Sequence, residues 1–182
     1  MFRNVRFYRI KTEWPKTEDD LSEQLSNEAF RPCSPYTEIS SGWEAPAEEL
    51  PELLCRRLAG ADLLRLRTQT RVLPAAAIKE ALEERVIEWE ERMQEKPSAR
   101  QKRKLKAELR DELLPKALPK SERVHGFYIH SIGILAIDAV SENKAERFLE
   151  KLRALQARGA RIFYGHDPEF WKSVPQAPAP IV

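Results

Sequence analysis

Basic side chains concentrate in one short run near the middle of the chain. Between Arg100 and Arg110 the sequence has six lysines and arginines and a single acid, Glu108. Clustered lysines and arginines bind phosphate groups through charge and hydrogen bonds, without reading a base sequence. The run therefore predicts a site for a polyanion, and the phosphate backbone of a nucleic acid is its natural partner.

A helical pattern separates the charge of this run from its apolar residues. At about 100° per residue, three leucines span roughly 80° of a helix and form an apolar seam: Leu105, Leu109 and Leu113. The basic residues on and beside the opposite side are Arg100, Arg103, Lys104, Lys106 and Arg110. A solvated surface face is the alternative interpretation. Such a face usually mixes glutamates with lysines because pairs four residues apart stabilise a helix, as in residues 79–96. The asymmetry favours the polyanion site.

The remaining reactive side chains do not form a recognisable site. His125 and His130 would point to opposite faces of a strand, and no cysteine supports them or His166 at metal-ligand spacing. Cys33 and Cys55 are expected to be free thiols. No metal site or cofactor is therefore predicted.

Catalysis has equally little support in the sequence. Asp138, with Glu142 beyond it, could belong to a metal-dependent nuclease, but that chemistry needs several converging carboxylates. A single aspartate beside a turn is more often a cap or a strand end. The sequence has no P-loop, dinucleotide fingerprint or G-x-S-x-G motif, so no catalytic residue is predicted.

Two aromatic features have a structural and a functional interpretation. Phe127 and Tyr128 could stack on exposed bases, although a strand before a hairpin usually buries one such ring. Trp89 lies on an apolar helical stripe with Ile78, Leu82, Val86 and Met93, and is expected in the core.

The composition limits the protein class without identifying a function. The 182 residues are 42% hydrophobic and 33% charged, with a formal net charge of only +2. Any basic surface must therefore come from local segregation of charge. The first residues mix charge with apolar side chains, which is unlike a signal peptide, and no apolar run is long enough to span a membrane.

The expected elements indicate an α+β fold with an antiparallel sheet, packed helices and a protruding long helical hairpin. Alternating residues predict strands at 4–10 and 61–73, and two more strands that meet near His130. Thr17 and Ser98 are expected to cap helices, and Pro97 separates two long helices. The expected organisation is an α+β segment (1–74), a helical arm (75–120), a β-hairpin with a helix that completes the body (121–164) and a proline-rich tail (165–182).

A series of segments resembles a known family. The segments are "FRPC" (30–33), "GW" (42–43), "RVLPAAAIKEALEERV" (71–86), "KLKAELRDELLPKAL" (104–118) and "GILAIDAVSENKAERFLEKLR" (133–153). In this order, over residues 2–155, they resemble RdgC, the recombination-associated family of proteobacteria. The resemblance implies a cytoplasmic, nucleoid-associated protein that binds duplex DNA with little sequence preference and opposes RecA filaments. It also implies a clamp in which two horseshoe subunits close a ring around DNA.

The resemblance extends to individual positions. Six residues fall where the family pattern is also basic: Arg67, Arg71, Lys79, Lys102, Lys106 and Lys116. Four are additions of this sequence: Arg100, Arg103, Lys104 and Arg110. Leu118 replaces an aromatic residue that is implied to make a subunit contact. Because this chain resembles only the first half of the family, it is not expected to close a ring, and a homodimer stays possible.

The leading hypothesis is a non-enzymatic protein that binds double-stranded DNA, with single-stranded DNA as a second candidate partner, and restrains RecA-dependent recombination. The alternative is a protein-interaction module in which the leucine seam pairs with a longer relative or another partner. In that case the chain has little DNA affinity of its own.

Overall fold

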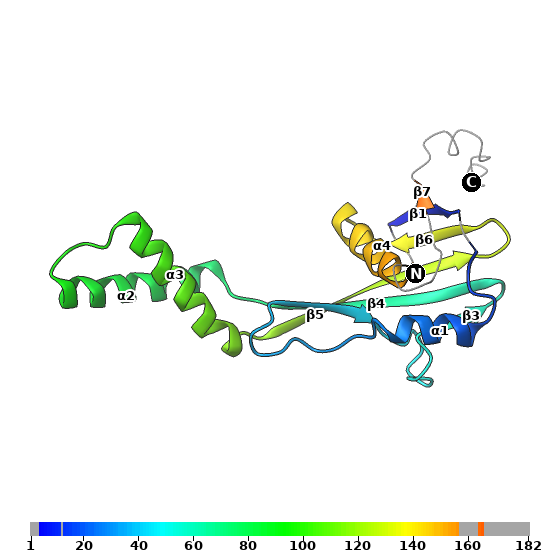
Figure 1. The fold of residues 1–182 in the computed structure, drawn as a ribbon, viewed down its shortest axis with the longest axis horizontal. Helices are drawn as coiled ribbons and strands as arrows, with labels where there is room; N and C mark the ends of the chain where they lie inside the picture. Colours follow the sequence, from blue (N-terminus) through cyan, green and yellow to red (C-terminus); the bar gives the residue numbers. More distant parts are fainter. Residues whose placement is uncertain (1–3, 12, 157–163, 166–182) are drawn as a thin grey trace, which may run out of the picture. The chain divides into compact units, whose positions relative to one another are not determined.

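The computed structural model describes residues 4–11, 13–156 and 164–165. Figure 1 shows the fold. The strands are β1 (Val5–Ile10), β2 (Ile39–Trp43), β3 (Cys55–Leu58), β4 (Ala61–Arg71), β5 (Pro119–Ile129), β6 (Ile134–Asp138) and β7 (Tyr164–Gly165). The helices are α1 (Glu18–Ser26), α2 (Ala75–Met93), α3 (Ala99–Leu113), the short 3-10 helix η1 (Leu114–Lys116) and α4 (Glu142–Gln156).

The strands form one sheet in the order β2-β4-β5-β6-β1-β7, with β3 paired to β4. The pairs β1–β6, β1–β7, β3–β4 and β5–β6 are antiparallel. The expected α+β fold with an antiparallel sheet is therefore confirmed. The expected strands at 4–10 and 61–73 are also confirmed. The short strand β3 was not predicted, because its residues show no clear alternation.

The chain divides into two compact units, and each gathers segments that are far apart in the sequence. Unit 1 contains residues 1–29, 43–66 and 124–182, and unit 2 contains residues 30–42 and 67–123. Strands β4 and β5 each contribute residues to both units.

Unit 1 contains the hydrophobic core. The largest fully buried side chains there include Trp43 and Phe148, whose rings meet edge to face at 5.0 Å between centroids. Helix α4 contributes the apolar face expected from its sequence: Ala145, Phe148, Leu149, Leu152 and Leu155 are all buried. At Gly126 of β5 a Cβ atom would lie 2.6 Å from Phe148 Cζ. Glycine is therefore needed here, because any side chain would collide with this ring.

A buried carboxylate ties three other segments of unit 1 together. Asp62 is fully buried and accepts hydrogen bonds from Trp14 Nε1 (2.7 Å), Arg57 Nε (2.6 Å) and His130 Nε2 (3.1 Å). Burial alone would raise the pKa of Asp62, but the hydrogen bonds from these three groups outweigh it and keep the pKa below its usual value. His130, considered above as a metal ligand, thus bonds to a structural carboxylate.

Unit 2 contains the two long helices, which pack against each other as a helical hairpin. Ser98 caps α3 in a capping box with Gln101, as expected, and α2 ends with Gln94 in the left-handed conformation. Thr17 likewise caps α1 in unit 1 by accepting a hydrogen bond from Asp20 N at 3.0 Å. The two caps and the break at Pro97 confirm the helix starts and the helix boundary that the sequence predicts.

Candidate nucleic-acid interface

The leucine seam of α3 is buried inside unit 2. Leu105 and Leu109 are almost completely covered, and Leu113 is half-buried. The rest of α3 is largely exposed, so the helix keeps its basic residues in solvent while it packs through its leucines. The angular separation of charge from apolar residues expected from the sequence is therefore confirmed for this helix.

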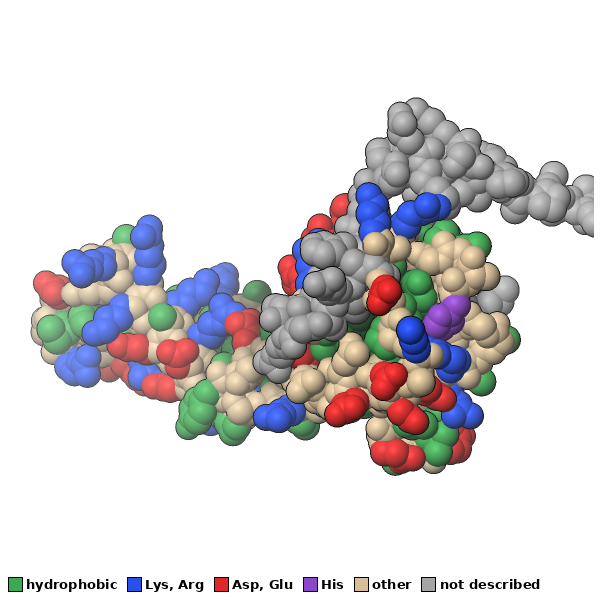
Figure 2. All heavy atoms as spheres, turned by 45° about the vertical axis from the view of Figure 1, so that its right-hand side comes forward, with side chains coloured by type: hydrophobic (Ala, Val, Ile, Leu, Met, Phe, Trp, Pro, Cys, Tyr) green, Lys and Arg blue, Asp and Glu red, His purple; other side chains and the backbone are tan. Residues whose placement is uncertain are grey.

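Five of the ten basic residues that the sequence singles out are exposed and have no ion pair or hydrogen bond from their side chains to any described residue. We call them the unpaired cations: Arg100, Lys102, Arg103 and Lys106 of α3, and Lys116 of η1. Figure 2 shows lysine and arginine side chains along much of the helical hairpin, with acidic side chains among them. Clustered cations without partners repel one another, and a polyanion relieves this repulsion.

Three other predicted residues already have acidic partners within unit 2. Lys79 pairs with Glu83 and Lys104 with Glu108, each at 3.7 Å and one helical turn apart. Arg110 of α3 makes an ion pair with Glu38. The pairs of Lys79 and Lys104 are exposed and loose, so they contribute little and can exchange for a phosphate.

The guanidinium of Arg71 on β4 is held by hydrogen bonds to backbone carbonyls. Its guanidinium donates to the carbonyl oxygens of Ser34 (3.0 Å), Ala117 (2.7 Å), Pro115 (3.4 Å) and Cys33 (3.4 Å). A guanidinium has five N–H donors in a planar fork, so one side chain can bind several carbonyls at once. Arg71 thereby joins the end of the helical hairpin to the loop before β2.

Arg67, two residues earlier on β4, is also held by its neighbours. It donates to Ser121 Oγ from Nε (3.2 Å) and Nη2 (3.0 Å), and its guanidinium lies 4.4 Å from the Phe30 ring centroid. Gln69, between the two arginines, donates to Ser121 Oγ and accepts from the Cys33 backbone N–H. The structure therefore gives Arg67 and Arg71 contacts that hold unit 2 together, and a phosphate role for them stays a prediction.

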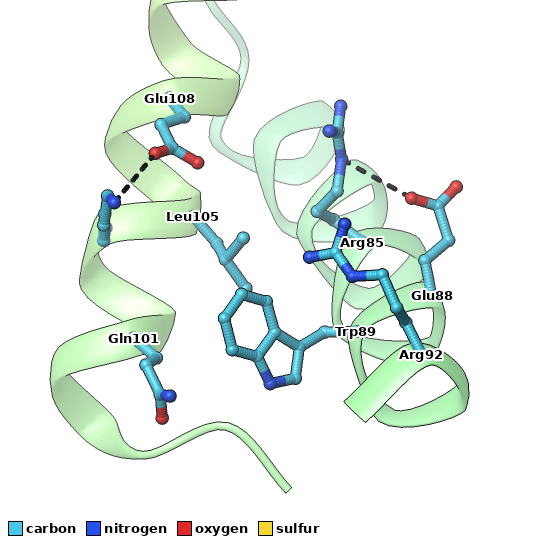
Figure 3. A pocket seen from close by; sticks show the side chains of 8 residues that line it. Arg85, Glu88, Trp89, Arg92, Gln101, Leu105 and Glu108 are labelled. Carbon is cyan, nitrogen blue, oxygen red and sulfur yellow. Dashed lines mark ion pairs between the residues drawn. The ribbon is translucent and has the colours of Figure 1, made fainter. Parts of the chain in front are cut away.

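A pocket of about 520 Å³ opens between α2 and α3. Figure 3 shows the Trp89 indole between the two helices, pointing toward Leu105, with Arg92 and Gln101 nearby. The expectation that Trp89 belongs to the core is wrong, because α2 has no fully buried residue and Trp89 is only half-buried. The sequence signal that identifies this pocket is a tryptophan followed three residues later by an arginine on the same helical face.

Leu118, the predicted subunit contact, is 82% exposed. Its carbonyl oxygen accepts a hydrogen bond from the Val72 backbone N–H at 3.2 Å, and the Val72 side chain is also exposed.

Within the described residues no helix is long and apolar enough to cross a membrane. The described part of the chain also has no cluster of three or more His, Cys, Asp or Glu residues that could hold a metal ion. Asp138, the candidate nuclease residue, accepts a hydrogen bond from the Asn4 backbone N–H.

Comparison with known proteins gives one consistent match. A family model described as "Putative exonuclease, RdgC" matches residues 1–160. The chain is similar to proteins named "Recombination-associated protein RdgC" from Pseudoalteromonas atlantica (30% identity) and Halorhodospira halophila (32% identity), each over 152 residues. A protein of the same name from Pseudomonas aeruginosa is 29% identical over 153 residues. These alignments cover 84% of this chain and 50% of each relative, so the chain spans about half the length of these relatives.

Replacing Arg71 with lysine tests its structural role while keeping the charge. A lysine cannot reach several carbonyls at once, so partly buried acceptors lose their donors. We expect Arg71→Lys to lower the free energy of unfolding by about 1–3 kcal/mol, measured by urea denaturation. The matched control is Arg103→Lys on the exposed side of α3, which should change stability by less than about 0.5 kcal/mol. Equal stability of the wild type and Arg71→Lys would contradict this role.

Proposed function

The chain belongs to the RdgC family, and on that basis we propose that it binds DNA through the unpaired cations and restrains RecA-dependent recombination. The phosphate backbone is the ligand, and duplex DNA is the main partner, with single-stranded DNA also bound. The proposed location is the cytoplasm, at the nucleoid. Neither a cofactor nor a catalytic step is part of the proposed activity.

The observation that carries this proposal is the difference between paired and unpaired basic residues. Arg67, Arg71 and Arg110 donate to groups of the protein itself. The unpaired cations Arg100, Lys102, Arg103, Lys106 and Lys116 instead extend into solvent from α3 and η1 without partners among the described residues. Lys79 and Lys104 can join them, because their exposed pairs are weak. Contacts of this kind fix a protein on the backbone but carry no base information, so sequence preference should be weak.

The alternative, a protein-interaction module, relied on the leucine seam of α3. That seam is covered within unit 2, because Leu105 and Leu109 are buried. Pairing of the seam with another protein would require the helical hairpin to open. The observations therefore favour the DNA-binding function over this alternative.

Charge reversal on α3 tests the proposal directly. If the five unpaired cations each meet a phosphate, log K for duplex DNA should fall with log salt concentration at a slope of about −4 to −5. Arg103→Glu combined with Lys106→Glu should weaken binding to different duplex sequences equally and reduce this slope by about 2. Fluorescence anisotropy across a salt series measures both quantities.

The matched control carries the same change in net charge on unit 1. Lys11→Glu with Lys16→Glu alters two exposed lysines there. This control should leave most of the affinity, because neither lysine belongs to the unpaired cations that are proposed to meet the phosphates. The proposal fails if the α3 variant binds as tightly as the wild type, or if both variants lose affinity to the same extent.

The description "Putative exonuclease, RdgC" of the matching family model makes nuclease activity a separate question. We expect end-labelled single-stranded and duplex DNA to keep its length after incubation with the protein and Mg²⁺ or Mn²⁺. The physical reason is that metal-dependent phosphodiester cleavage needs several converging carboxylates, whereas Asp138 caps the backbone of Asn4. Denaturing gel electrophoresis is the measurement. Metal-dependent shortening that copurifies with the protein would show that the chain is an enzyme.

We also propose that Leu118 makes a contact between two copies of the chain. An 82% exposed leucine beside the exposed Val72 is an apolar surface that a second copy can cover. Sedimentation should detect a dimer of the wild type at micromolar concentration and a monomer for Leu118→Glu. Met93→Glu, at an exposed apolar residue of α2, is the control and should remain dimeric. A monomeric wild type, or a dimeric Leu118→Glu, would refute this contact.

A further inference from the structure

The pocket between α2 and α3 is large enough for a ligand and belongs entirely to unit 2. Its volume of about 520 Å³ lies within the range of small-molecule sites. Both helices contribute to it, Trp89 and Arg92 from α2, and Gln101 and Lys104 from α3. The pocket therefore depends on the packing of the helical hairpin and not on a loop.

The floor of the pocket combines an aromatic ring with an unused donor. In Figure 3 the Trp89 indole points into the space between the helices and toward Leu105. Its Nε1–H is buried and has no acceptor among the described residues. A buried donor without an acceptor costs free energy, so a ligand that displaces the groups covering Nε1 and brings an acceptor gains a hydrogen bond. The ligand should thus be planar, with a carbonyl or ring-nitrogen acceptor at its edge.

The lining of the pocket has three basic residues, Arg85, Arg92 and Lys104, against two acidic ones, Glu88 and Glu108, so its charge is mixed with a small positive excess. The Arg92 guanidinium lies 5.4 Å from the Trp89 ring centroid, where it can also stack on a planar ligand. Lys104 lines the pocket and has only an exposed, 3.7 Å pair with Glu108. Arg85, by contrast, is committed to Glu112 at 2.8 Å. The ligand should therefore also carry an anionic group that reaches Lys104.

One of the unpaired cations, Arg100, is a neighbour of the lining residue Lys104 on α3. Arg100 lies one helical turn before Lys104, so the two side chains are neighbours on the same side of α3. A chain of phosphates that crosses Arg100 and Lys104 passes the mouth of the pocket. A heteroaromatic ring joined to such a chain is a nucleotide within a nucleic-acid strand.

We propose that this pocket receives one unpaired base of single-stranded DNA, while Arg100 and Lys104 hold the adjacent phosphates. The base edge accepts the Trp89 Nε1–H, and its plane packs against Leu105 and beneath Arg92. A base in a duplex cannot enter, because it is stacked and paired. The inference rests on the proposed DNA binding, since the same α3 surface holds the backbone, and it adds a base-dependent contact that the duplex lacks.

The test compares three DNA ligands of equal length: oligothymidine, an oligomer of abasic sites, and a mixed-sequence duplex. Each is titrated with the full chain and with Trp89→Phe, which keeps an aromatic ring but removes the N–H donor. The wild type should bind oligothymidine more tightly than the abasic strand. Trp89→Phe should lose about 2- to 12-fold in affinity for oligothymidine, the range expected for one hydrogen bond. Its affinities for the abasic strand and the duplex should not change.

The outcomes separate the pocket from the DNA-binding function. Equal binding of oligothymidine and the abasic strand by the wild type would overturn the pocket, even if Trp89→Phe failed to fold. An equal loss by Trp89→Phe on all three ligands would also overturn it, because the effect would then be structural. If duplex binding still responds to Arg103→Glu with Lys106→Glu, only the pocket inference has failed. If the wild type binds none of the three ligands, both proposals fail together.

Discussion

Unit 2 depends on the Arg71 guanidinium and the backbone carbonyls that it joins. The two helices of the hairpin bury only a narrow seam around Leu105 and Leu109, and α2 has no fully buried residue. The large apolar core belongs to unit 1. In unit 2 the Arg71 guanidinium on β4 donates to the carbonyls of Ser34 and Cys33 and to those of Pro115 and Ala117, and so joins these two segments. Because the contacts with Cys33, Pro115 and Ala117 are partly buried, these carbonyls need donors, and arginine can supply several from one side chain.

This constraint also decides which basic residues are available to a ligand. A guanidinium that satisfies backbone carbonyls cannot turn to a phosphate without leaving those carbonyls unpaired. Arg67 is held similarly by Ser121 and Phe30. Arg67 and Arg71 of β4 thus stabilise the region from which the helical hairpin starts, whereas the unpaired cations of α3 remain in solvent. The arginines of β4 are used inside the protein, and the unpaired cations are gathered on α3 and η1. This segregation explains how a chain with a net charge of only +2 presents a local cationic surface.

Local sequence was enough to predict the elements that have a strong period or a clear cap. The leucine seam of α3, the Ser98 and Thr17 caps and the core face of α4 follow from spacing and hydrogen-bonding chemistry within a few residues. Strand β3 has four residues and no alternation, so nothing local marks it; its pairing with β4 defines it. Trp89 was misplaced in the core for a similar reason. A helical stripe shows which side chains share a face, but not how completely the opposite helix covers that face.

The sequence by itself determined that one helix separates leucines from basic residues, and that its elements resemble those of the RdgC family. Only the tertiary structure decided which of ten basic side chains have partners. Glu38 reaches Arg110 across 72 positions of sequence, and Ser121 reaches Arg67 across 54. Such partners come from distant segments that the fold brings together, and the spacing of charges along one helix contains no information about them. The indole N–H of Trp89, which has no acceptor among the residues that the structure describes, likewise lies between α2 and α3, two helices that pack against each other. Local periodicity places side chains on a face, whereas their partners depend on long-range packing.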